Sequence, residues 1–309
     1  MKISVVSDLH LEFSGVELKN TQNADVLVLS GDITVAQYLH DYPFGTTLTE
    51  ASGQNAQVAR RTREFFDNVT KEFKHVVYVA GNHEFYNGKW YAALDYLRAE
   101  CANYPRLHFL EGETIEIDGV VFIGSTLWTN LNGGCPMTTH AVQDLMNDYR
   151  VIRNDRLEYR RLRPFETMRR HYDAVDYIKC VIQNIRESDK PDRKVVVVGH
   201  HLPSSKSTNP QYAAQYLMNG AYFSELSEMI LDHPEISLWT CGHTHHPHWY
   251  YIGDTLVACN PRGYVEPGEC GYDERTGWDP HFVIDLDDMP DPSIVKSTYD
   301  RSIKELNDE

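Results

Sequence analysis

The sequence predicts an α/β protein, and three features of the chain lead to that prediction. Short apolar runs that are rich in β-branched side chains are typical of strands buried on both faces. Helical patterns lie between several of these runs, and the alternation of strands with helices indicates an α/β domain. Several runs also end at a glycine followed by Asp, Asn or His, as strands do where a sheet binds a ligand.

The expected strands contain no charged residue, and they are residues 3–7, 26–30, 76–80, 120–123, 195–198, 238–241, 256–259 and 282–284. Amphipathic helices are expected at 56–74, 89–101 and 166–187, where apolar side chains recur three and four positions apart. The last strands are joined by short turns, which favours a sheet that is antiparallel in part. No linker stands out, so we expect a single domain over residues 1–309, with a helical, arginine-rich insertion at about 139–190.

The charge of the chain narrows the class of partner. The 309 residues carry a formal net charge of −16, which makes a poor general binder of nucleic acid, because phosphate contacts need Lys and Arg. Residues 150–170 differ, with eight arginines against three acidic residues. This arginine cluster either draws an anionic substrate towards a site or is a solvated helix face, and charge runs are usually solvated.

The sequence also bears on location. No run of about 18 apolar residues predicts a membrane helix, and the N-terminal stretch lacks the apolar segment of a secretory signal. The six cysteines are scattered and form no CxxC pair. We therefore expect reduced thiols in a cytoplasmic protein with no membrane partner. The sequence leaves the oligomeric state open.

Five of the expected strands are followed by side chains that can bind a metal ion or take part in catalysis. In chain order these residues are Asp8 and His10, Asp32, Asn82 and His83, His200 and His201, and His243 and His245. A glycine at such a strand end lets the backbone turn sharply and approach a site closely. Five endings of this kind are improbable as structural turns alone, so we expect the side chains to converge at the carboxyl ends of the strands.

The histidine cluster at 243–248 illustrates the expected geometry. In an extended segment, residues two positions apart face the same side, so His243 and His245 can share a site while His246 points away. A surface histidine cluster can arise by chance, but two neutral imidazoles on one side suit a transition metal such as Zn, Fe or Mn. His246 and His248 are expected at the rim of the site.

The other strand ends can supply the remaining ligands. Asp8 and His10, two residues apart, can hold one metal ion. The carboxylate of Asp32 has lone pairs for two ions, and Asn82 with His200 can hold the second. Nitrogen and oxygen ligands without thiolate suit Mn, Fe, Zn or Co rather than a structural cysteine-zinc site. The expected cofactors are two divalent transition-metal ions of undetermined identity.

The motifs DLH, GD, GNHE, GHH and GHTH, in this order, resemble those of the calcineurin-like metallophosphoesterase superfamily. They span residues 8–245 of the chain. The resemblance implies a four-layer α-β-β-α sandwich, in which two mixed sheets pack face to face and helices lie outside. It also implies the ligand sets, which are Asp8, His10 and His245 for the first metal, Asn82, His200 and His243 for the second, and Asp32 for both.

The resemblance further implies hydrolysis of phosphate esters. A hydroxide that bridges the two metals would attack the phosphorus atom, so the bridging ligand Asp32 counts as catalytic. His83 is not a ligand in this pattern and would protonate the leaving oxygen or stabilise its charge. The alternative for His83 is a hydrogen bond that only orients a neighbouring ligand.

The motifs also separate substrate classes. Protein serine/threonine phosphatases of this superfamily carry GDxHG and GDxxDRG, whereas this chain has DLHLE and GDITVA. Nucleases usually carry extra nucleic-acid-binding regions, which the acidic charge disfavours. A non-catalytic scaffold would be expected to have lost ligands, and none is lost here. Small phosphodiesters, such as cyclic nucleotides, or small phosphomonoesters remain the expected substrates, with specificity set by the segments 36–56, 130–170 and 203–222.

Four further residues are expected near the site. His201, Asn260 and Arg262 are candidate substrate contacts. The alternatives are that His201 orients a ligand and that Asn260 and Arg262, in the stretch CNPRGY, form a structural turn or order the histidine loop. Trp128 is expected to pack beneath the site.

Overall fold

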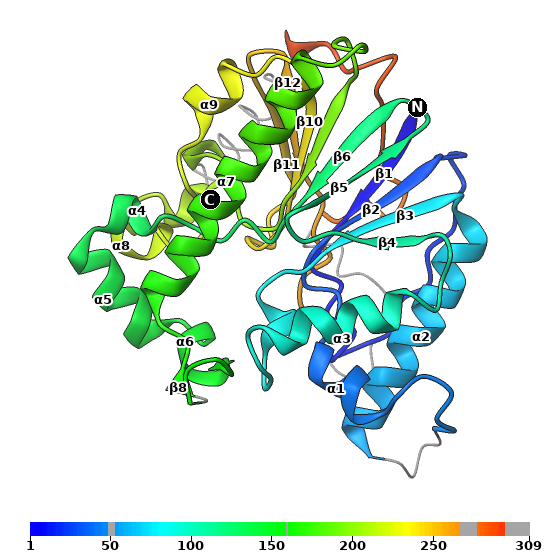
Figure 1. The fold of residues 1–309 in the computed structure, drawn as a ribbon, viewed down its shortest axis with the longest axis vertical. Coiled ribbons are helices and arrows are strands. Elements are labelled where there is room, and N and C mark those ends of the chain that lie inside the picture. The colour runs from blue at the N-terminus through cyan, green and yellow to red at the C-terminus, as the bar shows by residue number, and fades with distance from the viewer. Residues whose placement is uncertain (49–52, 159, 266–276, 294–309) are drawn as a thin grey trace.

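The computed structural model describes residues 1–48, 53–158, 160–265 and 277–293. Two mixed β-sheets pack face to face, and helices cover the outer face of each sheet (Figure 1). Separate apolar clusters fill the space between the sheets and the space under each helical layer. The predicted α/β class and the four-layer sandwich are therefore confirmed.

The first sheet has five strands in the described part of the chain. Its order is β13 (Val283–Asp285), β1 (Lys2–Val6), β2 (Val26–Ser30), β3 (His75–Val79) and β4 (Leu107–Phe109). β1 to β4 are parallel, and β13 runs antiparallel to β1. The helices on this side are α1 (Ala36–Asp41), α2 (Gln54–Glu72) and α3 (Ala92–Cys101). They cover the outer face, where the ring of Phe66 on α2 contacts Tyr78 of β3.

The second sheet has six described strands. Its order is β11 (His248–Ile252), β12 (Thr255–Cys259), β10 (Ile236–Cys241), β9 (Val195–Val198), β6 (Val120–Gly124) and β5 (Glu113–Ile117). The four central strands are parallel, and the two edge strands are antiparallel to their neighbours. The long helix α7 (Pro164–Arg186) and the short helix α9 (Ser227–Leu231) cover its outer face.

The space between the sheets explains the continuous apolar runs of the sequence. Val5, Val28 and Val77 of the first sheet share one buried cluster with Phe122 and Val196 of the second. The opposite faces of the same strands lie under helices, so neither face is open to water and no polar alternation can develop. Burial of each such side chain stabilises the fold by about 2 kcal/mol relative to exposure.

Both sheets present the carboxyl ends of parallel strands to the same region. β1, β2 and β3 belong to the first sheet, and β9 and β10 belong to the second. At this end the hydroxyl of Ser30, the last residue of β2, donates to the hydroxyl of Thr240 on β10 at 2.7 Å. This bond joins the two sheets directly beneath the segments that carry the predicted ligands.

All eight predicted strands and all three predicted helices are present at closely similar bounds. The strands β4, β5 and β11 were not predicted. β4 has only three residues, which is too short for a pattern. β5 and β11 are edge strands with charged, histidine or aromatic residues, because one face of each is partly open to solvent.

Short helices form a cap beside the sandwich (Figure 1). They are α4 (Leu131–Gly134), α5 (Pro136–Leu145), α6 (Asp148–Val151) and α8 (Tyr216–Asn219), with the small hairpin of β7 (Arg153–Asn154) and β8 (Arg160–Arg161). The predicted insertion at 139–190 is therefore not one unit. Its first half belongs to the cap, and its second half is α7, which belongs to the outer layer of the sandwich. The single domain stays a prediction.

Contacts between the cap and its neighbours occupy two residues of the arginine cluster. The guanidinium of Arg160 binds both carboxylate oxygens of Glu166, at 2.9 and 3.0 Å. The guanidinium carbon of Arg156 lies 3.7 Å from the centre of the Tyr91 ring, a cation–π contact. These contacts agree with the interpretation of the cluster as a solvated, locally paired surface.

Candidate metal centre and adjoining cavity

Predicted ligands from both sheets converge on one site. They form two groups, Asp8 with His10 and His245, and Asp32 with His200 and His243. Within each group the donor atoms all lie within 4.8 Å of one another. From its first to its last residue, each group spans more than 200 residues of the sequence, so the convergence comes from the packing of the two sheets.

Asp32 lies between the two groups. Its Oδ2 is 3.9 Å from Nε2 of His10, and its Oδ1 is 3.4 Å from Nε2 of His200. In the first group, Nε2 of His245 is 3.0 Å from Nε2 of His10 and 3.3 Å from Oδ1 of Asp8. The two oxygens of one carboxylate therefore face different groups, which is the position of a bridging ligand.

In the second group, nitrogen and oxygen donor atoms point towards one another. Nδ1 of His200 donates to the carbonyl oxygen of Ser30 at 2.8 Å, so Nε2 is the ring atom that faces the site. This Nε2 faces Oδ1 of Asn82 at 3.1 Å, while the amide nitrogen of Asn82 donates to the Tyr86 hydroxyl. Nε2 of His243 is buried and has no hydrogen-bond partner among the described residues. Such convergent donor atoms fit a divalent transition metal.

The buried charges also call for a cation. Burial lowers the pKa of His200, but the negative charge of Asp32 outweighs it and raises that pKa to about 10. Burial alone would raise the pKa of Asp8, yet its contact with His245 holds the pKa below the ordinary value. Two fully buried carboxylates thus stay ionised, and the site needs either protons or metal ions to balance them.

Two positions next to predicted ligands have room only for glycine, because a carboxylate oxygen lies close to the backbone there. A Cβ atom on Gly81 would lie 2.1 Å from Oδ1 of Asp32, and one on Gly242 would lie 2.5 Å from Oδ2 of Asp8. Because Gly242 leaves this space free, the backbone N–H of His243 donates to both oxygens of Asp8, at 2.9 and 3.1 Å. These contacts give the physical reason for two of the glycines that the sequence places at strand ends.

The ligand residues hold an uncommon backbone conformation. Five of them have positive φ angles in the left-handed region, namely Asp8 (53°), His10 (47°), Asp32 (56°), His243 (71°) and His245 (51°). Non-glycine residues adopt this region rarely, and such residues cluster at functional sites.

Glu84, the last residue of GNHE, holds two loops that carry predicted ligands in place. It is fully buried and accepts hydrogen bonds from the backbone N–H groups of Asp32 and Gly81 through Oε2, at 3.0 and 2.7 Å. Its Oε1 accepts from the N–H of Ile33 and the hydroxyl of Tyr78, both at 2.7 Å. One carboxylate therefore ties the loop after β2 to the loop after β3.

Replacing Glu84 with glutamine is expected to lower the free energy of unfolding by about 2 kcal/mol, because the new NH2 group faces backbone donors. Metal affinity should fall by roughly 10- to 100-fold, since the carboxylate orients a ligand. Glu111→Gln is the matched control, because Glu111 is also buried but accepts from Thr126 away from the ligands. Urea unfolding and metal titration measure the two effects. Equal metal affinity in both variants would contradict this role.

His83 lies beside the ligands and is held from three sides. Its backbone N–H donates to Oδ1 of Asp32 at 2.8 Å. Its Nδ1 contacts Oε1 of Glu12 at 2.8 Å, and its Nε2 lies 3.2 Å from the Tyr264 hydroxyl. Burial lowers the pKa of His83, but Asp32 and Glu12 outweigh burial and raise it to about 9. Glu12 also contacts Nδ1 of His10 at 3.0 Å, so it orients both imidazoles.

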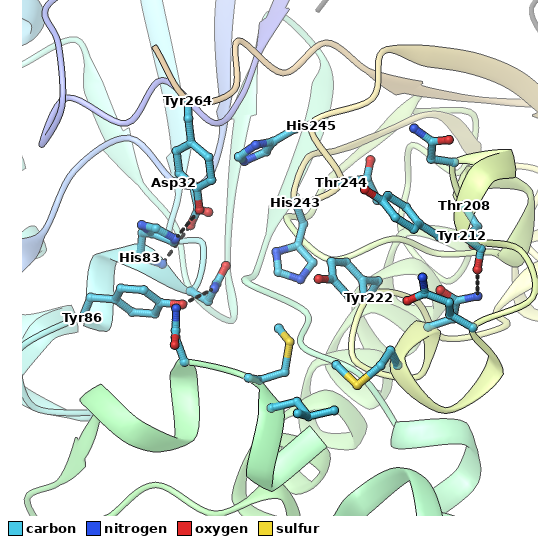
Figure 2. A pocket seen from close by; sticks show the side chains of 18 residues that line it. Asp32, His83, Tyr86, Thr208, Tyr212, Tyr222, His243, Thr244, His245 and Tyr264 are labelled. Carbon is cyan, nitrogen blue, oxygen red and sulfur yellow. Dashed lines mark hydrogen bonds between the residues drawn. The ribbon is translucent and has the colours of Figure 1, made fainter. Parts of the chain in front are cut away.

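A cavity of about 570 Å³ opens next to these residues (Figure 2). Asp32, His83, His243, His245 and Tyr264 line one side, and the segment 208–222 lines the opposite side. Residues 145–147 of the cap contribute a third wall. The volume is in the range of pockets for small molecules.

The chemical character of the lining is neutral. Aromatic, thioether and amide side chains dominate away from the metal ligands: Tyr86, Tyr212, Tyr222, Tyr264, Met146, Met218, Asn147, Asn209, Gln215 and Asn219. Among the described residues that line the cavity there is no Lys or Arg, and Asp32 is the acidic one. The arginine cluster contributes to a separate surface pocket with Arg150, Arg160, Arg161 and Arg163.

Three candidate substrate contacts lie outside the described cavity lining. His201 is buried, with Nδ1 3.1 Å from the carbonyl oxygen of Thr126, and its ring stacks on Trp128. Asn260 donates to the carbonyl oxygens of Val5 and Asp279, both at 2.8 Å. These contacts favour the structural alternative for both residues. Trp128 packs beneath the site as expected.

Arg262 is also buried, and it holds the loop that carries Asp8 and His10. Its guanidinium donates to the carbonyl oxygens of Leu9 and Gly15, both at 3.1 Å, and to the Ser14 hydroxyl at 2.8 Å. Arg262 therefore orders the loop of the predicted ligands Asp8 and His10. The structure has no turn at residues 259–264, where Pro261 instead forms a β-bridge with Ser7.

The expectation for His248 was wrong, whereas His246 is partly exposed as expected. His248 begins β11 and is only 4% exposed, so it lies in the core of the second sheet rather than at the rim. Sequence reasoning also missed the roles of Glu12, Glu84 and Tyr264. Two of these stand inside the motifs DLHLE and GNHE, where a carboxylate next to a ligand was the available signal.

Comparison with known sequences identifies relatives along most of the chain. The family profile described as calcineurin-like phosphoesterase matches residues 1–247. An uncharacterised protein of Acanthamoeba polyphaga mimivirus is 28% identical over 302 residues, which are 92% of this chain and 96% of that protein. In the described part of the chain, no helix has both the length and the apolar character needed to cross a membrane.

Comparison with solved structures finds similar proteins at low sequence identity. Phosphopantetheinyl hydrolase from Mycobacterium tuberculosis superposes with a TM-score of 0.59 and 14% identity, over 85% of this chain and 89% of that one. A dimetal phosphatase from Danio rerio matches 84% of this chain and 86% of its own, with 13% identity and a TM-score of 0.46. At this identity the first likeness bears on the fold alone.

Proposed function

The chain belongs to the calcineurin-like phosphoesterase family and is a metal-dependent hydrolase, and from this premise we propose that it cleaves small-molecule phosphodiesters at a pair of divalent metal ions. The observation that carries the proposal is the neutral cavity beside the converging ligands. Phosphomonoesters are the second candidate class within the same chemistry.

The proposed ligand sets follow the geometry of the two groups. Asp8, His10 and His245 would hold one ion, and Asn82, His200 and His243 the other, with Asp32 between them. When bound, the ions would activate a water molecule and neutralise charge on the phosphoryl group. Their identity among Mn, Fe, Zn and Co depends on availability, because nitrogen and oxygen ligands accept each of them.

His83 is proposed to serve the leaving group. It lines the cavity next to the ligands without belonging to either metal group. The carboxylate of Glu12 fixes its Nδ1 at 2.8 Å, so the Nε2 side of the ring is directed at the Tyr264 hydroxyl, another group that lines the cavity. A proton held at Nε2 is therefore available to an oxygen that leaves from the phosphorus.

The lining favours diesters over monoesters. A phosphomonoester near neutral pH approaches a double negative charge, and Lys or Arg commonly balances charge beyond the metals. The described lining of this cavity offers no Lys or Arg, and the cationic His83 is already paired with the carboxylate of Glu12. A diester carries one negative charge and a second organic group, which the tyrosine, methionine and amide side chains can surround.

The size and walls of the cavity also bear on larger substrates. The segment 208–222 and the cap residues 145–147 face the ligands across the cavity, which leaves room for a compact molecule. Protein phosphatase and nuclease activities are therefore lesser alternatives. We also propose a single catalytic domain and a cytoplasmic location, supported by the five free cysteines in the described residues.

Hydrolysis of bis-p-nitrophenyl phosphate is expected to exceed that of p-nitrophenyl phosphate by about tenfold or more in kcat/KM. The measurement starts from protein stripped by a chelator, and activity should return when Mn²⁺ is added. Met218→Lys, which places an ammonium group in the lining, should shift the ratio towards the monoester. Met137→Lys is the control, because Met137 is 67% exposed and does not line the cavity.

Two outcomes would oppose these proposals separately. A wild-type preference for the monoester would remove the argument from the neutral lining while leaving the hydrolase intact. No hydrolysis of either ester by protein that has bound two metal ions would revive the non-catalytic scaffold on this fold.

A further inference from the structure

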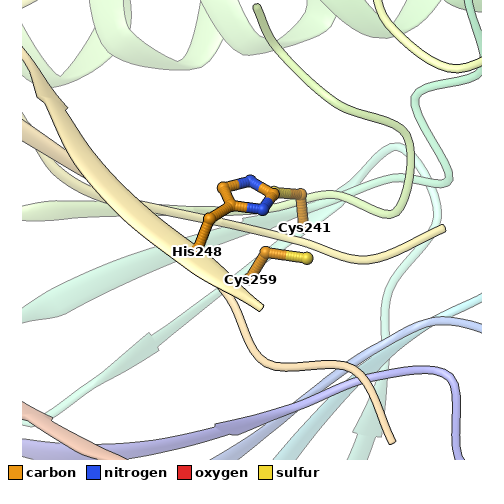
Figure 3. A group of neighbouring side chains, drawn as sticks. All are labelled: Cys241, His248 and Cys259. Carbon is orange, nitrogen blue, oxygen red and sulfur yellow. The ribbon is translucent and has the colours of Figure 1, made fainter. Parts of the chain in front are cut away.

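Three neighbouring strands of the second sheet place sulfur and nitrogen ligands side by side. Cys241 of β10 pairs with Cys259 of β12, and Cys259 pairs with His248 of β11. Residues that pair directly across strands project to the same face of a sheet. The three side chains therefore form one row at the same level of the sheet (Figure 3).

The row is closely spaced and closed to solvent. The two sulfur atoms and a ring nitrogen of His248 all lie within 4.8 Å of one another. Cys241 and Cys259 are 0% exposed, His248 is 4% exposed, and both cysteines are free thiols. Each sulfur also lies 3.7 Å from a backbone carbonyl oxygen, that of Ala258 for Cys241 and that of Gly242 for Cys259.

The imidazole of His248 is oriented but incompletely bonded. Its Nδ1 donates to the carbonyl oxygen of His246 at 2.7 Å, which leaves Nε2 as a lone pair. This Nε2 is buried and has no hydrogen-bond partner among the described residues. A backbone carbonyl that fixes the tautomer of a histidine is the usual support of a metal-binding imidazole.

We propose that Cys241, Cys259 and His248 bind one zinc ion, separately from the divalent metals of the phosphoesterase site. Two thiolates and one imidazole are a preferred ligand set for Zn²⁺, whereas Mn²⁺ prefers oxygen. Binding would release one proton from each thiol and form two Zn–S bonds and one Zn–N bond.

The position of this zinc site suggests a structural role. Cys241 is the last residue of β10 and precedes Gly242 and the ligand His243. A metal ion that joins β10, β11 and β12 would fix the end of the strand from which the GHTH loop begins. The site is closed to solvent, so a substrate cannot reach the ion.

Zinc X-ray absorption of the purified wild-type protein tests the proposal without any substitution. Sulfur scattering at about 2.3 Å from zinc is expected, and the phosphoesterase site cannot supply it because its ligands are nitrogen and oxygen. A zinc-loaded protein with nitrogen and oxygen scattering alone would overturn the proposal.

Cobalt substitution assigns the sulfur ligands to residues. Wild-type protein stripped of metal and loaded with Co²⁺ should show an intense thiolate-to-cobalt absorption band in the near ultraviolet. It should also bind one more Co²⁺ ion per chain than the Cys259→Ala protein binds. The band should be lost in Cys259→Ala and kept in Cys101→Ala, a control for a cysteine buried under the other sheet. The assignment would be refuted if Cys101→Ala lost the absorption band while Cys259→Ala kept it. A Cys241–Cys259 disulfide in protein purified with a reducing agent would also refute it.

Discussion

Replacing Asp32 with asparagine is expected to reduce kcat for bis-p-nitrophenyl phosphate by roughly 1000-fold, a size typical for loss of a central electrostatic group. The two oxygens of Asp32 face His10 and His200 at 3.9 and 3.4 Å, so one substitution weakens both metal groups. Asparagine removes a negative charge and turns an NH2 group towards one of the proposed cations. Steady-state kinetics with a Mn²⁺ titration measures the loss, and metal analysis should show fewer than two Mn²⁺ ions per chain.

Asp25→Asn is the control for this experiment, because Asp25 is a partly exposed carboxylate that binds Lys2 and Lys74 outside the site. Its activity and metal content should equal those of the wild type. Asp32→Asn protein that kept activity within tenfold and bound two metal ions would show that the carboxylate does not bridge them.

Replacing His83 with asparagine is expected to reduce kcat by roughly 100- to 1000-fold while the metal content stays at the wild-type level. The reason is that His83 contacts Glu12 and Tyr264 and belongs to neither of the two metal groups proposed here. The size of the loss should depend on the leaving group. A phenyl diester, whose leaving oxygen needs a proton, should lose more activity than a p-nitrophenyl diester, whose leaving oxygen is a stable anion.

His246→Asn provides the matched control, since His246 is a partly exposed histidine that directly follows the GHTH motif and does not line the cavity. It should leave both substrates unaffected. An equal loss for phenyl and p-nitrophenyl esters in His83→Asn would assign His83 to the alternative role of orienting a ligand.

The part of the site that the sequence could predict is the part carried by strand ends. Parallel strands bring their carboxyl ends to one edge, so a ligand-type residue after each apolar run is predicted near its counterparts. Asp8, Asp32 and His200 illustrate this, because each follows a strand whose apolar pattern is clear. The bounds of these strands were also close to those expected from the sequence alone.

Contacts made by loops and edge strands could not be predicted in the same way. Tyr264 reaches His83 from a segment 181 residues away, and no local pattern announces such a contact. Arg262 lies in a turn-forming sequence, yet its side chain is buried under the loop that carries Asp8 and His10. His248 was expected at the rim because β11 was not predicted as a strand. In β11 the residues alternate between buried and partly exposed, and His248 is one of the buried residues.

The left-handed backbone conformation of five predicted ligands lowers stability, although the side chains at these positions are needed for activity. Each such conformation costs roughly 1 kcal/mol, and the metal-free chain has no metal bond to offset that strain. Glycine would relieve the strain at the same positions, but it would remove the donor atoms. Selection for hydrolysis therefore retains residues that selection for stability alone would replace. A duplicated copy freed from catalytic selection should drift towards glycine at these five positions before its core changes.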